Sequence, residues 1–279
     1  MSSNAVSGST QVAAVIGSPV RHSLSPVIHN AAFRAAGLDW VYVALEVGAA
    51  RAAEAFAGIR ALGLAGVSVT TPHKDAAFAA VDEVSVSAQA MNAVNCIHRV
   101  GDRLLGYNTD GDGFVDSLRA DAEFDPAGHS VAVVGAGGAA RSIIEALGRA
   151  GAARVVVVNR TLLRAQQAAS LAGGCGVVGT LDDLAECDVV VNATSVGLGS
   201  SELSIPVAAL RSSHLIADVV YHPIETALLR AAESAGARTL DGLGMLVHQA
   251  ARQFTIWTGV TAPVAEMRRA AEAALAQRR

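Results

Sequence analysis

One side chain in this sequence is suited to moving a proton. Of the 21 basic residues, Lys74 is the only lysine, and all the others are arginines. It ends the segment Val-Thr-Thr-Pro-His-Lys at residues 69–74. A guanidinium stays protonated in proteins, whereas a partly buried ammonium can lose and regain a proton. Lys74 is therefore a candidate for acid–base chemistry, although most lysines simply lie on the surface.

A glycine-rich turn in the second half of the chain could hold a phosphate. An apolar run at 131–134 leads into Gly135, Ala136, Gly137, Gly138 and Ala139, and a helix is expected to follow. Such glycines let the backbone turn tightly and approach a pyrophosphate, while the helix N-terminus supplies N–H groups. Glycines also serve ordinary turns, but the order strand, turn and helix predicts a dinucleotide site.

The polar residues after the next predicted strand indicate which dinucleotide binds. Asn159, Arg160 and Thr161 follow the strand at 154–158, and Arg164 comes one helical turn later. An enzyme that uses NAD would place Asp or Glu here, on the ribose hydroxyls. Asn and Arg instead favour a 2′-phosphate, which a guanidinium can pair with. The alternative is a solvated helix face, but the position favours NADP. A further polar turn at 192–197 is a secondary candidate contact.

Small polar residues after the first predicted strand could seat a carboxylate. Ser23 and Ser25 lie in the loop at 17–26, beside the start of a predicted helix. A helix N-terminus favours an anion. Ser25 followed by Pro26 is also a helix N-cap signature, so both roles are open. Thr71-Pro72 is expected to open a second helix, whose first turn would point His73 away from Lys74.

The elements that must position these residues follow an alternating βα pattern, which is typical of parallel sheets. Short apolar runs predict strands at 12–16, 41–47, 67–70, 131–134, 155–158, 189–191 and 215–219. Two more runs, 94–97 and 104–107, flank Gly101 and predict an antiparallel hairpin. The fold class is therefore α/β, with an N-terminal mixed-sheet substrate domain and a Rossmann-like, doubly wound NADP domain.

The polar stretch at 121–130 suggests a domain boundary. Two long helices are predicted at 242–258 and 263–277, after the nucleotide domain is complete. Such a pair needs a surface to pack on, so we expect it to return to the first domain. The predicted substrate domain then comprises residues 1–120 and 243–279, and the nucleotide domain comprises residues 121–242.

Composition excludes several other classes of protein. With 52% hydrophobic residues, 16% charged residues and a net charge of -4, the chain has a large core and no basic surface for nucleic acid. No apolar run reaches the roughly 18 residues of a membrane span, and no secretory signal begins the chain. The three cysteines fit neither a disulfide framework nor a zinc site, so no metal is expected. We expect a cytoplasmic protein that acts on a small molecule.

Nine segments in one order resemble the shikimate dehydrogenase family. They are Ser-Leu-Ser-Pro at 23–26 with His29-Asn30, the Val-Thr-x-Pro-x-Lys segment at 69–74, Ala-Val-Asn at 93–95, Asn-Thr-Asp-Gly at 108–111, the glycine turn at 135–139, Asn-Arg-Thr at 159–161, Asn-Ala-Thr-Ser at 192–195, the Asp-to-Pro run at 218–223, and Asp-Gly-Leu-Gly-Met-Leu at 241–246 leading to Gln249. Nearly the whole chain takes part in the resemblance.

The resemblance implies NADPH-dependent, reversible reduction of 3-dehydroshikimate to shikimate, a step of aromatic amino acid biosynthesis. It implies Lys74 and Asp110 as the catalytic pair, with Ser23 and Ser25 on the substrate carboxylate. Two roles are open for Lys74: it donates the proton, or it acts as a fixed charge on the developing alkoxide. The remaining implied substrate contacts are Thr70, Asn95, Asp110, Tyr221 and Gln249. The implied cofactor contacts are Gly135, Ala136, Gly137, Gly138, Ala139, Asn159, Arg160, Thr161, Arg164, Val219 and Gly242.

Three departures from the family pattern leave some points open. Ser68 stands where the family usually has Asn, Asn92 where it has Gly, and Cys96 where Thr is frequent. Serine has a shorter reach than asparagine, which bears on the choice among related hydroxy acids. The alternatives are a quinate/shikimate or aminoshikimate-type dehydrogenase that uses NAD, and a catalytically silent NADP-binding module. Monomer and homodimer are both compatible with the sequence.

Overall fold

The chain forms two compact units, each with its own six-stranded sheet. They are seen in a computed structural model that describes residues 6–277. The first unit ends at Thr109 and resumes at Gln249, and the second spans Asp110–His248. The predicted α/β class is confirmed. The contacts place residues 110–120 in the second unit, whereas the sequence-based prediction places them in the substrate domain. The division into a substrate domain and a nucleotide domain at these residues stays a prediction.

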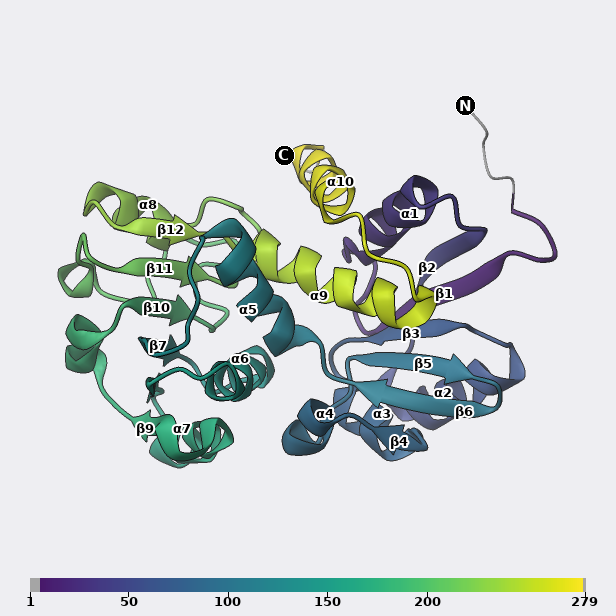
Figure 1. Cartoon of the computed structure of the whole chain (residues 1–279), viewed down its shortest axis with the longest axis horizontal. Helices are drawn as coiled ribbons and strands as arrows, with labels where there is room; N and C mark the ends of the chain where they lie inside the picture. The colour runs from purple at the N-terminus through teal and green to yellow at the C-terminus, as the bar shows by residue number, and fades with distance from the viewer. Residues whose placement is uncertain (1–5, 278–279) are drawn as a thin grey trace. The chain divides into compact units, whose positions relative to one another are not determined.

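The first unit contains a mixed sheet (Figure 1), with strand order β2-β1-β3-β5-β6-β4. β1 is parallel to β2 and β3, whereas β5 is antiparallel to both β3 and β6, which confirms the predicted hairpin. The two-residue β4 is too short to leave a periodic signal and was not predicted. The strands are β1 (Gln11–Gly17), β2 (Trp40–Glu46), β3 (Gly66–Val69), β4 (Glu83–Val84), β5 (Cys96–Val100) and β6 (Arg103–Tyr107).

Helices cover both faces of this sheet. One core contains Phe56, Ile59 and Ala77 from two of the helices, packed on Val67 and Ile97 of the strands. On the other side α10 packs against α1, which confirms that the terminal helices return to the first domain. The helices are α1 (Ser25–Ala35), α2 (Ala52–Ala61), α3 (Lys74–Ala80), α4 (Val86–Met91), α9 (Gly242–Thr258, from Gln249 onward in this unit) and α10 (Val264–Ala276).

An aromatic cluster fixes α9 to the first sheet. The His29 ring stacks on Tyr42 with centroids 4.4 Å apart, and the Trp257 ring lies 5.1 Å from His29. The Trp257 indole N–H donates to the backbone carbonyl of Ile97 at 3.0 Å. Aromatic side chains bury large areas, so these contacts are a major part of the packing of α9.

The second unit has an all-parallel sheet of order β12-β11-β10-β7-β8-β9. Alternate residues of its strands belong to different cores, as the period of two requires. Val131 and Val133 face one core, whereas Ala132 and Val134 face the other. β9 and β12, of three residues each, were not predicted. The strands are β7 (Ser130–Val134), β8 (Arg154–Val158), β9 (Gly176–Val178), β10 (Val189–Asn192), β11 (Leu215–Asp218) and β12 (Arg238–Leu240).

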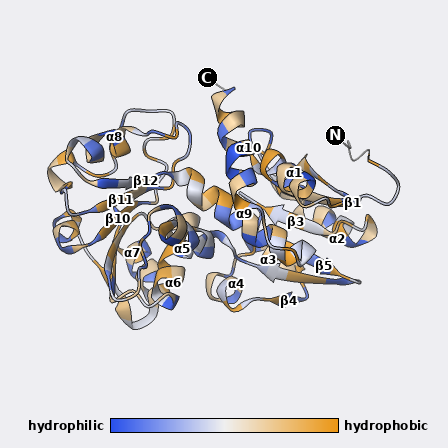
Figure 2. Cartoon of the chain, turned by 45° about the horizontal axis from the view of Figure 1, so that its top comes forward, coloured by the Kyte–Doolittle hydropathy of each residue, from blue (hydrophilic) through white to orange (hydrophobic). Residues whose placement is uncertain are grey.

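The helices of the second unit cover the two cores. Ile143 and Leu147 of α6 pack in the first core, and Leu228 and Leu229 of α8 pack in the second. Figure 2 shows apolar and polar residues on different sides of these helices, as amphipathic packing requires. The helices are α5 (Asp110–Asp121), α6 (Gly138–Arg149), α7 (Leu162–Ala169) and α8 (Ala227–Ser234).

Two predicted helix starts are wrong. Leu24 is the N-cap of α1, so Ser25 is already helical and makes no capping hydrogen bond. α3 begins at Lys74 with His73 as its N-cap, and not at Pro72, whose peptide bond to Thr71 is cis. Gly37 has a φ of 66° just after the C-cap of α1, which is typical of a glycine that ends a helix. Among the described residues no helix is long and apolar enough to cross a membrane.

His29 links stability of the fold to pH. Burial lowers its pKa from 6.5 to about 3, so unfolding takes up a proton between these two pH values. This contribution leaves stability highest above pH 6.5 and reduces it as the pH falls toward 3. We expect the unfolding free energy of wild type to fall by up to about 1.4 kcal/mol per pH unit more steeply than that of a His29→Phe variant. Urea titrations at several pH values measure both slopes.

The control is His22→Phe, which changes an exposed histidine near the same helix. Its slope shows how much of any change comes from replacing a surface histidine by phenylalanine. Equal slopes for wild type and His29→Phe would show that His29 protonates as easily in the folded state as in the unfolded state.

Candidate active site

Two loops of the first unit meet beside Lys74. β1 and β3 are neighbours in parallel register, so the chain leaves both strands at the same edge of the sheet. The Ser18 N–H donates to the Thr71 carbonyl at 3.0 Å and joins the two loops. Within the first loop, the Ser25 N–H donates to the Ser23 hydroxyl at 3.2 Å. The structure therefore brings the loop at 17–26, which is predicted to bind a carboxylate, next to the segment that carries Thr70 and Lys74.

Lys74 is the first residue of α3, and its side chain is half-buried. The Val94 N–H donates to its backbone carbonyl at 3.0 Å, which fixes the start of the helix beside the segment that carries Asn95 and leads into β5. The neighbouring His73 is buried, and its Nε2 donates to the Val47 carbonyl at 2.6 Å. His73 thus holds the loop after β2, and the expectation that it points away from Lys74 agrees with this contact.

Asn95 and Gln249 belong to one buried network of side chains. The Asn95 amide donates to the Thr109 hydroxyl at 3.0 Å, and the Thr109 N–H donates back to Asn95 Oδ1 at 2.8 Å. Gln253 Nε2 donates to Thr109 Oγ1 at 3.2 Å and to Gln249 Oε1 at 2.8 Å. Gln253 was not predicted as part of the site. Its spacing of four residues from Gln249, on one helix face, is the signal that could have found it.

The three departures from the family pattern have clear positions. Asn92 is the C-cap of α4 in the left-handed region, with φ 48° and ψ 38°, where asparagine is tolerated best after glycine. Cys96 is buried in β5. Ser68 is buried in β3, where it accepts a hydrogen bond from Tyr42 at 2.6 Å and donates to Gln253 at 2.5 Å. Ser68 therefore belongs to the same buried network as Asn95 and Gln249.

The second unit brings its predicted cofactor residues to a topological switch point. The chain moves from β7 through β8 to β9 on one side and returns to β10 on the other, so a crevice is expected between β7 and β10. Gly135 follows β7 with a φ of 125°, and a Cβ there would lie 2.7 Å from the Ala193 carbonyl oxygen. Only glycine fits this turn. The secondary candidate at 192–197 does lie beside the glycine turn.

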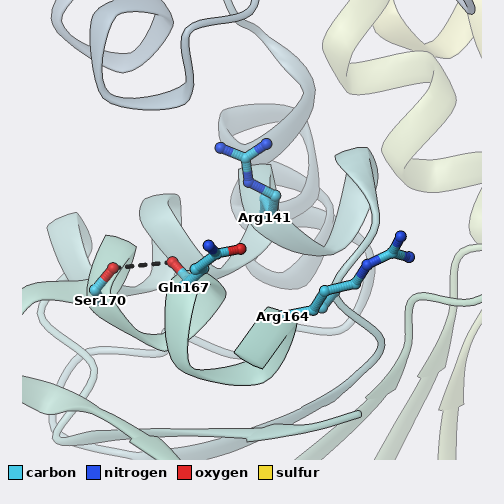
Figure 3. A pocket seen from close by; sticks show the side chains of 5 residues that line it. Arg141, Arg164, Gln167 and Ser170 are labelled. Atoms are coloured by element: carbon cyan, nitrogen blue, oxygen red, sulfur yellow. Dashed lines mark hydrogen bonds between the residues drawn. The ribbon is translucent and has the colours of Figure 1, made fainter. Parts of the chain in front are cut away.

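A pocket of about 530 Å³ lies beside this turn, close to the N-terminus of α6 (Figure 3). Arg141 extends from α6, and Arg164 and Gln167 extend from α7. The Ser170 hydroxyl donates to the Gln167 backbone carbonyl at 2.9 Å. The lining residues are Ala136, Arg141, Arg164, Gln167 and Ser170. The two guanidinium groups give the pocket the chemistry of a phosphate site.

Arg164 and Ala136, which are both predicted to contact the cofactor, therefore line the same pocket. Arg160 is exposed and is not among the lining residues. Asn159 Nδ2 donates to the Thr161 carbonyl at 3.0 Å and shapes the turn before α7. Arg141, Gln167 and Ser170 were missed. The helical spacing of 164 and 167 places Gln167 on the face of Arg164, and Arg141 was visible at the end of the glycine run.

Val219 and Gly242, which are far apart in the sequence, are in contact. Gly242 begins α9, and a Cβ on it would lie 2.5 Å from the Val219 carbonyl oxygen. The Val219 N–H donates to the Asn192 carbonyl at 3.0 Å, so the start of the loop after β11 is also bonded to the end of β10. The structure thus gathers these predicted cofactor contacts at the carboxyl edge of the sheet.

Asp218 fixes the loop that carries Val219 and Tyr221. Its carboxylate accepts hydrogen bonds from Asn192 Nδ2 at 2.8 Å, from the Val220 N–H at 3.0 Å and from the Thr226 hydroxyl at 2.7 Å. Burial raises the pKa of Asp218, and these hydrogen bonds offset part of that effect. Asp218 is a structural anchor for the loop.

Asp110 and Tyr221 lie in the second unit, whereas the other predicted substrate contacts lie in the first. Asp110 opens α5, directly after Thr109 of the buried network. Tyr221 is half-buried, directly after Val220, whose N–H is held by Asp218. The predicted pairing of Lys74 with Asp110 stays a prediction.

Among the described residues, no group of three or more His, Cys, Asp or Glu side chains could hold a metal.

Family models match three segments of the chain. Residues 15–97 match a shikimate dehydrogenase substrate-binding domain, residues 119–206 match a shikimate/quinate 5-dehydrogenase domain, and residues 242–272 match a shikimate 5-dehydrogenase C-terminal domain. The NADP-dependent shikimate dehydrogenase of Geobacter metallireducens is 42% identical, over 97% of this chain and 99% of the relative.

Solved structures agree over nearly the full length. A shikimate dehydrogenase in complex with NADP+ has a TM-score of 0.91 at 35% identity, covering 97% of this chain and 98% of the other. The Thermus thermophilus enzyme with NADP(H) and shikimate has a TM-score of 0.89 at 37% identity, covering 95% and 100%. The Corynebacterium glutamicum quinate dehydrogenase with NAD gives 0.87 at 32% identity, covering 95% and 99%.

The close approach at Gly242 predicts a stability effect. In a Gly242→Ala variant the new methyl group would displace the Val219 carbonyl, and we expect a loss of about 1–3 kcal/mol in unfolding free energy, measured by urea denaturation. Gly138→Ala is the matched control, because Gly138 also begins a helix and has nothing within 4 Å of its Cβ position. Equal stability of the two variants would mean that Val219 moves aside without cost.

Proposed function

The chain belongs to the shikimate dehydrogenase family, and we propose that Lys74 and Asp110 are the catalytic pair of this oxidoreductase. The reaction is the reversible, NADP-dependent interconversion of 3-dehydroshikimate and shikimate, in aromatic amino acid biosynthesis. The observation that carries the NADP assignment is the glycine turn at the switch point with the two-arginine pocket beside it. We expect the reaction to take place in the cytoplasm.

The second unit fits NADP. The turn at Gly135 has no room for a Cβ beside Ala193, which suits close approach of backbone N–H groups to a pyrophosphate. Arg141 and Arg164 would hold the 2′-phosphate that distinguishes NADP from NAD, and a bidentate guanidinium contact is favourable for this anion. Val219 and Gly242, at the same edge of the sheet, would contact the nicotinamide end.

When bound, the reduced cofactor supplies a hydride to the carbonyl carbon of the substrate. The protein must then supply a proton to the carbonyl oxygen, and Lys74 is the group we assign to this step. Its side chain is half-buried at the start of α3, in the segment that the first loop contacts. We assign Asp110 to orient Lys74 and to accept a hydrogen bond from a substrate hydroxyl.

The remaining side chains hold the substrate. Ser23 and Ser25, linked by a hydrogen bond, would bind the carboxylate near the N-terminus of α1. Thr70 follows β3 beside this loop, and the buried network holds Asn95 and Gln249 in fixed orientations for the ring hydroxyls. We assign Tyr221, next to the Asp218 anchor, to a further substrate contact.

The NAD-dependent quinate alternative is less well supported. Arg141 and Arg164 favour the 2′-phosphate, and the quinate dehydrogenase structure is less similar, at 32% identity, than the Geobacter relative at 42%. Rates with shikimate and quinate, each with NADP and NAD, separate the two activities. A silent NADP-binding module would gain thermal stability from NADP yet show no absorbance change at 340 nm with shikimate.

Removing Lys74 tests the catalytic assignment. Lys74→Ala should lower kcat by on the order of a hundredfold or more while shikimate binding is retained, because the proton donor is lost. Lys74→Arg restores the charge but not a transferable proton, so it should restore little of the rate. Steady-state kinetics at saturating NADP measure both effects. A Lys74→Ala enzyme within a few-fold of wild type would exclude a catalytic role.

Arg164→Ala tests the cofactor assignment. Loss of a charge-assisted hydrogen bond to phosphate costs about 1.5–3 kcal/mol, so the KM for NADP should rise by about 10–100-fold while the KM for NAD changes little. Arg230→Ala is the control, because it removes an exposed arginine of α8 in the same unit. Equal changes for the two cofactors would place the 2′-phosphate elsewhere.

A further inference from the structure

A buried chain of hydrogen bonds runs from β2 to α9 inside the first unit. The Tyr42 hydroxyl donates to Ser68 Oγ at 2.6 Å, and the Ser68 hydroxyl donates to Gln253 Oε1 at 2.5 Å. Gln253 Nε2 then donates to Gln249 Oε1 at 2.8 Å. Tyr42, Ser68 and Gln253 are all buried, and none of them is more than 6% exposed.

All the hydrogen bonds in this series run in one donor-to-acceptor direction, which determines the orientation of the Gln249 amide. Ser68 uses its one proton toward Gln253 Oε1, so the Gln253 nitrogen must face Gln249 and Thr109. Gln249 in turn directs its oxygen at Gln253, which turns its NH2 group to the other side of the amide. An NH2 group is the donor that a carboxylate or hydroxyl oxygen of the substrate requires.

We propose that Tyr42 is a positioning residue for substrate binding, which acts through Ser68 and Gln253 to hold the Gln249 amide with its NH2 group toward the substrate. This inference rests on the proposed function, in which Gln249 contacts the substrate. It also explains how the short Ser68 side chain serves where the family usually has asparagine: the serine occupies the space between a phenol and an amide, and relays the orientation of one to the other.

The surroundings of Tyr42 hold its hydroxyl in place. Asn30 Nδ2 donates to the Tyr42 carbonyl at 2.8 Å, and the Tyr42 N–H donates to Asn30 Oδ1 at 2.9 Å, so α1 clamps the backbone of β2. The His29 ring lies on the Tyr42 ring with an interplanar angle of 8°. A phenol that is fixed at both backbone and ring cannot turn away from Ser68 without disturbing the packing.

Both aromatic groups keep one protonation state under assay conditions. Burial raises the pKa of the Tyr42 phenol, and hydrogen bonds with Ser68 and Ser25 offset only part of this effect. Burial lowers the pKa of His29 to about 3, so its ring stays neutral. Tyr42 is therefore a hydrogen-bond donor at any pH used for the reaction, and the donor-to-acceptor direction of the hydrogen bonds does not change with pH.

A double-mutant cycle tests whether Tyr42 acts through Gln249. Kinetics with shikimate and NADP are compared for wild type, Tyr42→Phe, Gln249→Ala and the double variant. Tyr42→Phe removes the hydroxyl and its neutral hydrogen bonds with Ser68 and Ser25, so we expect the KM for shikimate to rise about 3–10-fold, with kcat and the KM for NADP within about twofold of wild type. In the Gln249→Ala background, Tyr42→Phe should change the KM no further.

Two more variants separate positioning from general loss of packing. Tyr107→Phe is the matched control, because Tyr107 is a partly buried tyrosine on β6 of the same unit, and its KM values should equal those of wild type. Ser68→Ala breaks the series of hydrogen bonds between Tyr42 and Gln253. It should raise the KM for shikimate as Tyr42→Phe does, and this rise should also disappear in the Gln249→Ala background. This comparison holds even if Tyr42→Phe lowers the thermal midpoint.

Each outcome has a separate meaning. An unchanged KM in Tyr42→Phe, or an equal rise with and without Gln249, overturns the positioning role while the assignment of Gln249 stands. An unchanged KM in Gln249→Ala itself overturns that assignment and this inference together. The loss of proton transfer in Lys74→Ala is independent of either result.

Discussion

A buried amide must have all its hydrogen-bonding groups satisfied, and in the first unit this constraint ties together elements that are far apart in the chain. Gln253 is 2% exposed and bonds to Ser68, Thr109 and Gln249. An unpaired amide in this position would cost about 1–3 kcal/mol, so β3, the segment after β6 and α9 are held in one arrangement. The predicted substrate contacts Asn95 and Gln249 inherit their orientation from this network.

Aromatic rings pack beside the network. Trp257 and His29 fill the space between α9, α1 and the sheet, which excludes water from the hydrogen bonds. A lower local dielectric strengthens hydrogen bonds that are made and penalises those that are not. Lys74 is half-buried at the start of α3, just after the loop that follows β3.

In the second unit the controlling feature is close approach of backbone segments at the carboxyl edge of the parallel sheet. The backbone at Gly135 lies close to Ala193, and the backbone at Gly242 lies close to Val219. The Asp218 carboxylate joins the end of β10 to the loop after β11. These contacts leave no room for side chains on the two glycines. Phosphate recognition is then divided between the backbone of the turn and the guanidinium groups of Arg141 and Arg164 in the pocket beside it.

The sequence by itself determined the α/β class, the seven principal parallel strands, the hairpin, the glycine turn and the return of the terminal helices. These depend on local periodicity, on glycine and on the order of motifs, all of which are written along the chain. The pattern did not reveal β4, β9 and β12, which are too short for a periodic signal, nor the true starts of α1 and α3. Only the tertiary structure decided that Ser68 joins Tyr42 to Gln253, and that Arg141 and Gln167 share a pocket with Arg164. Hydrogen bonds between residues 26 or 185 positions apart depend on which strands and helices become neighbours, and no spacing along the chain encodes that.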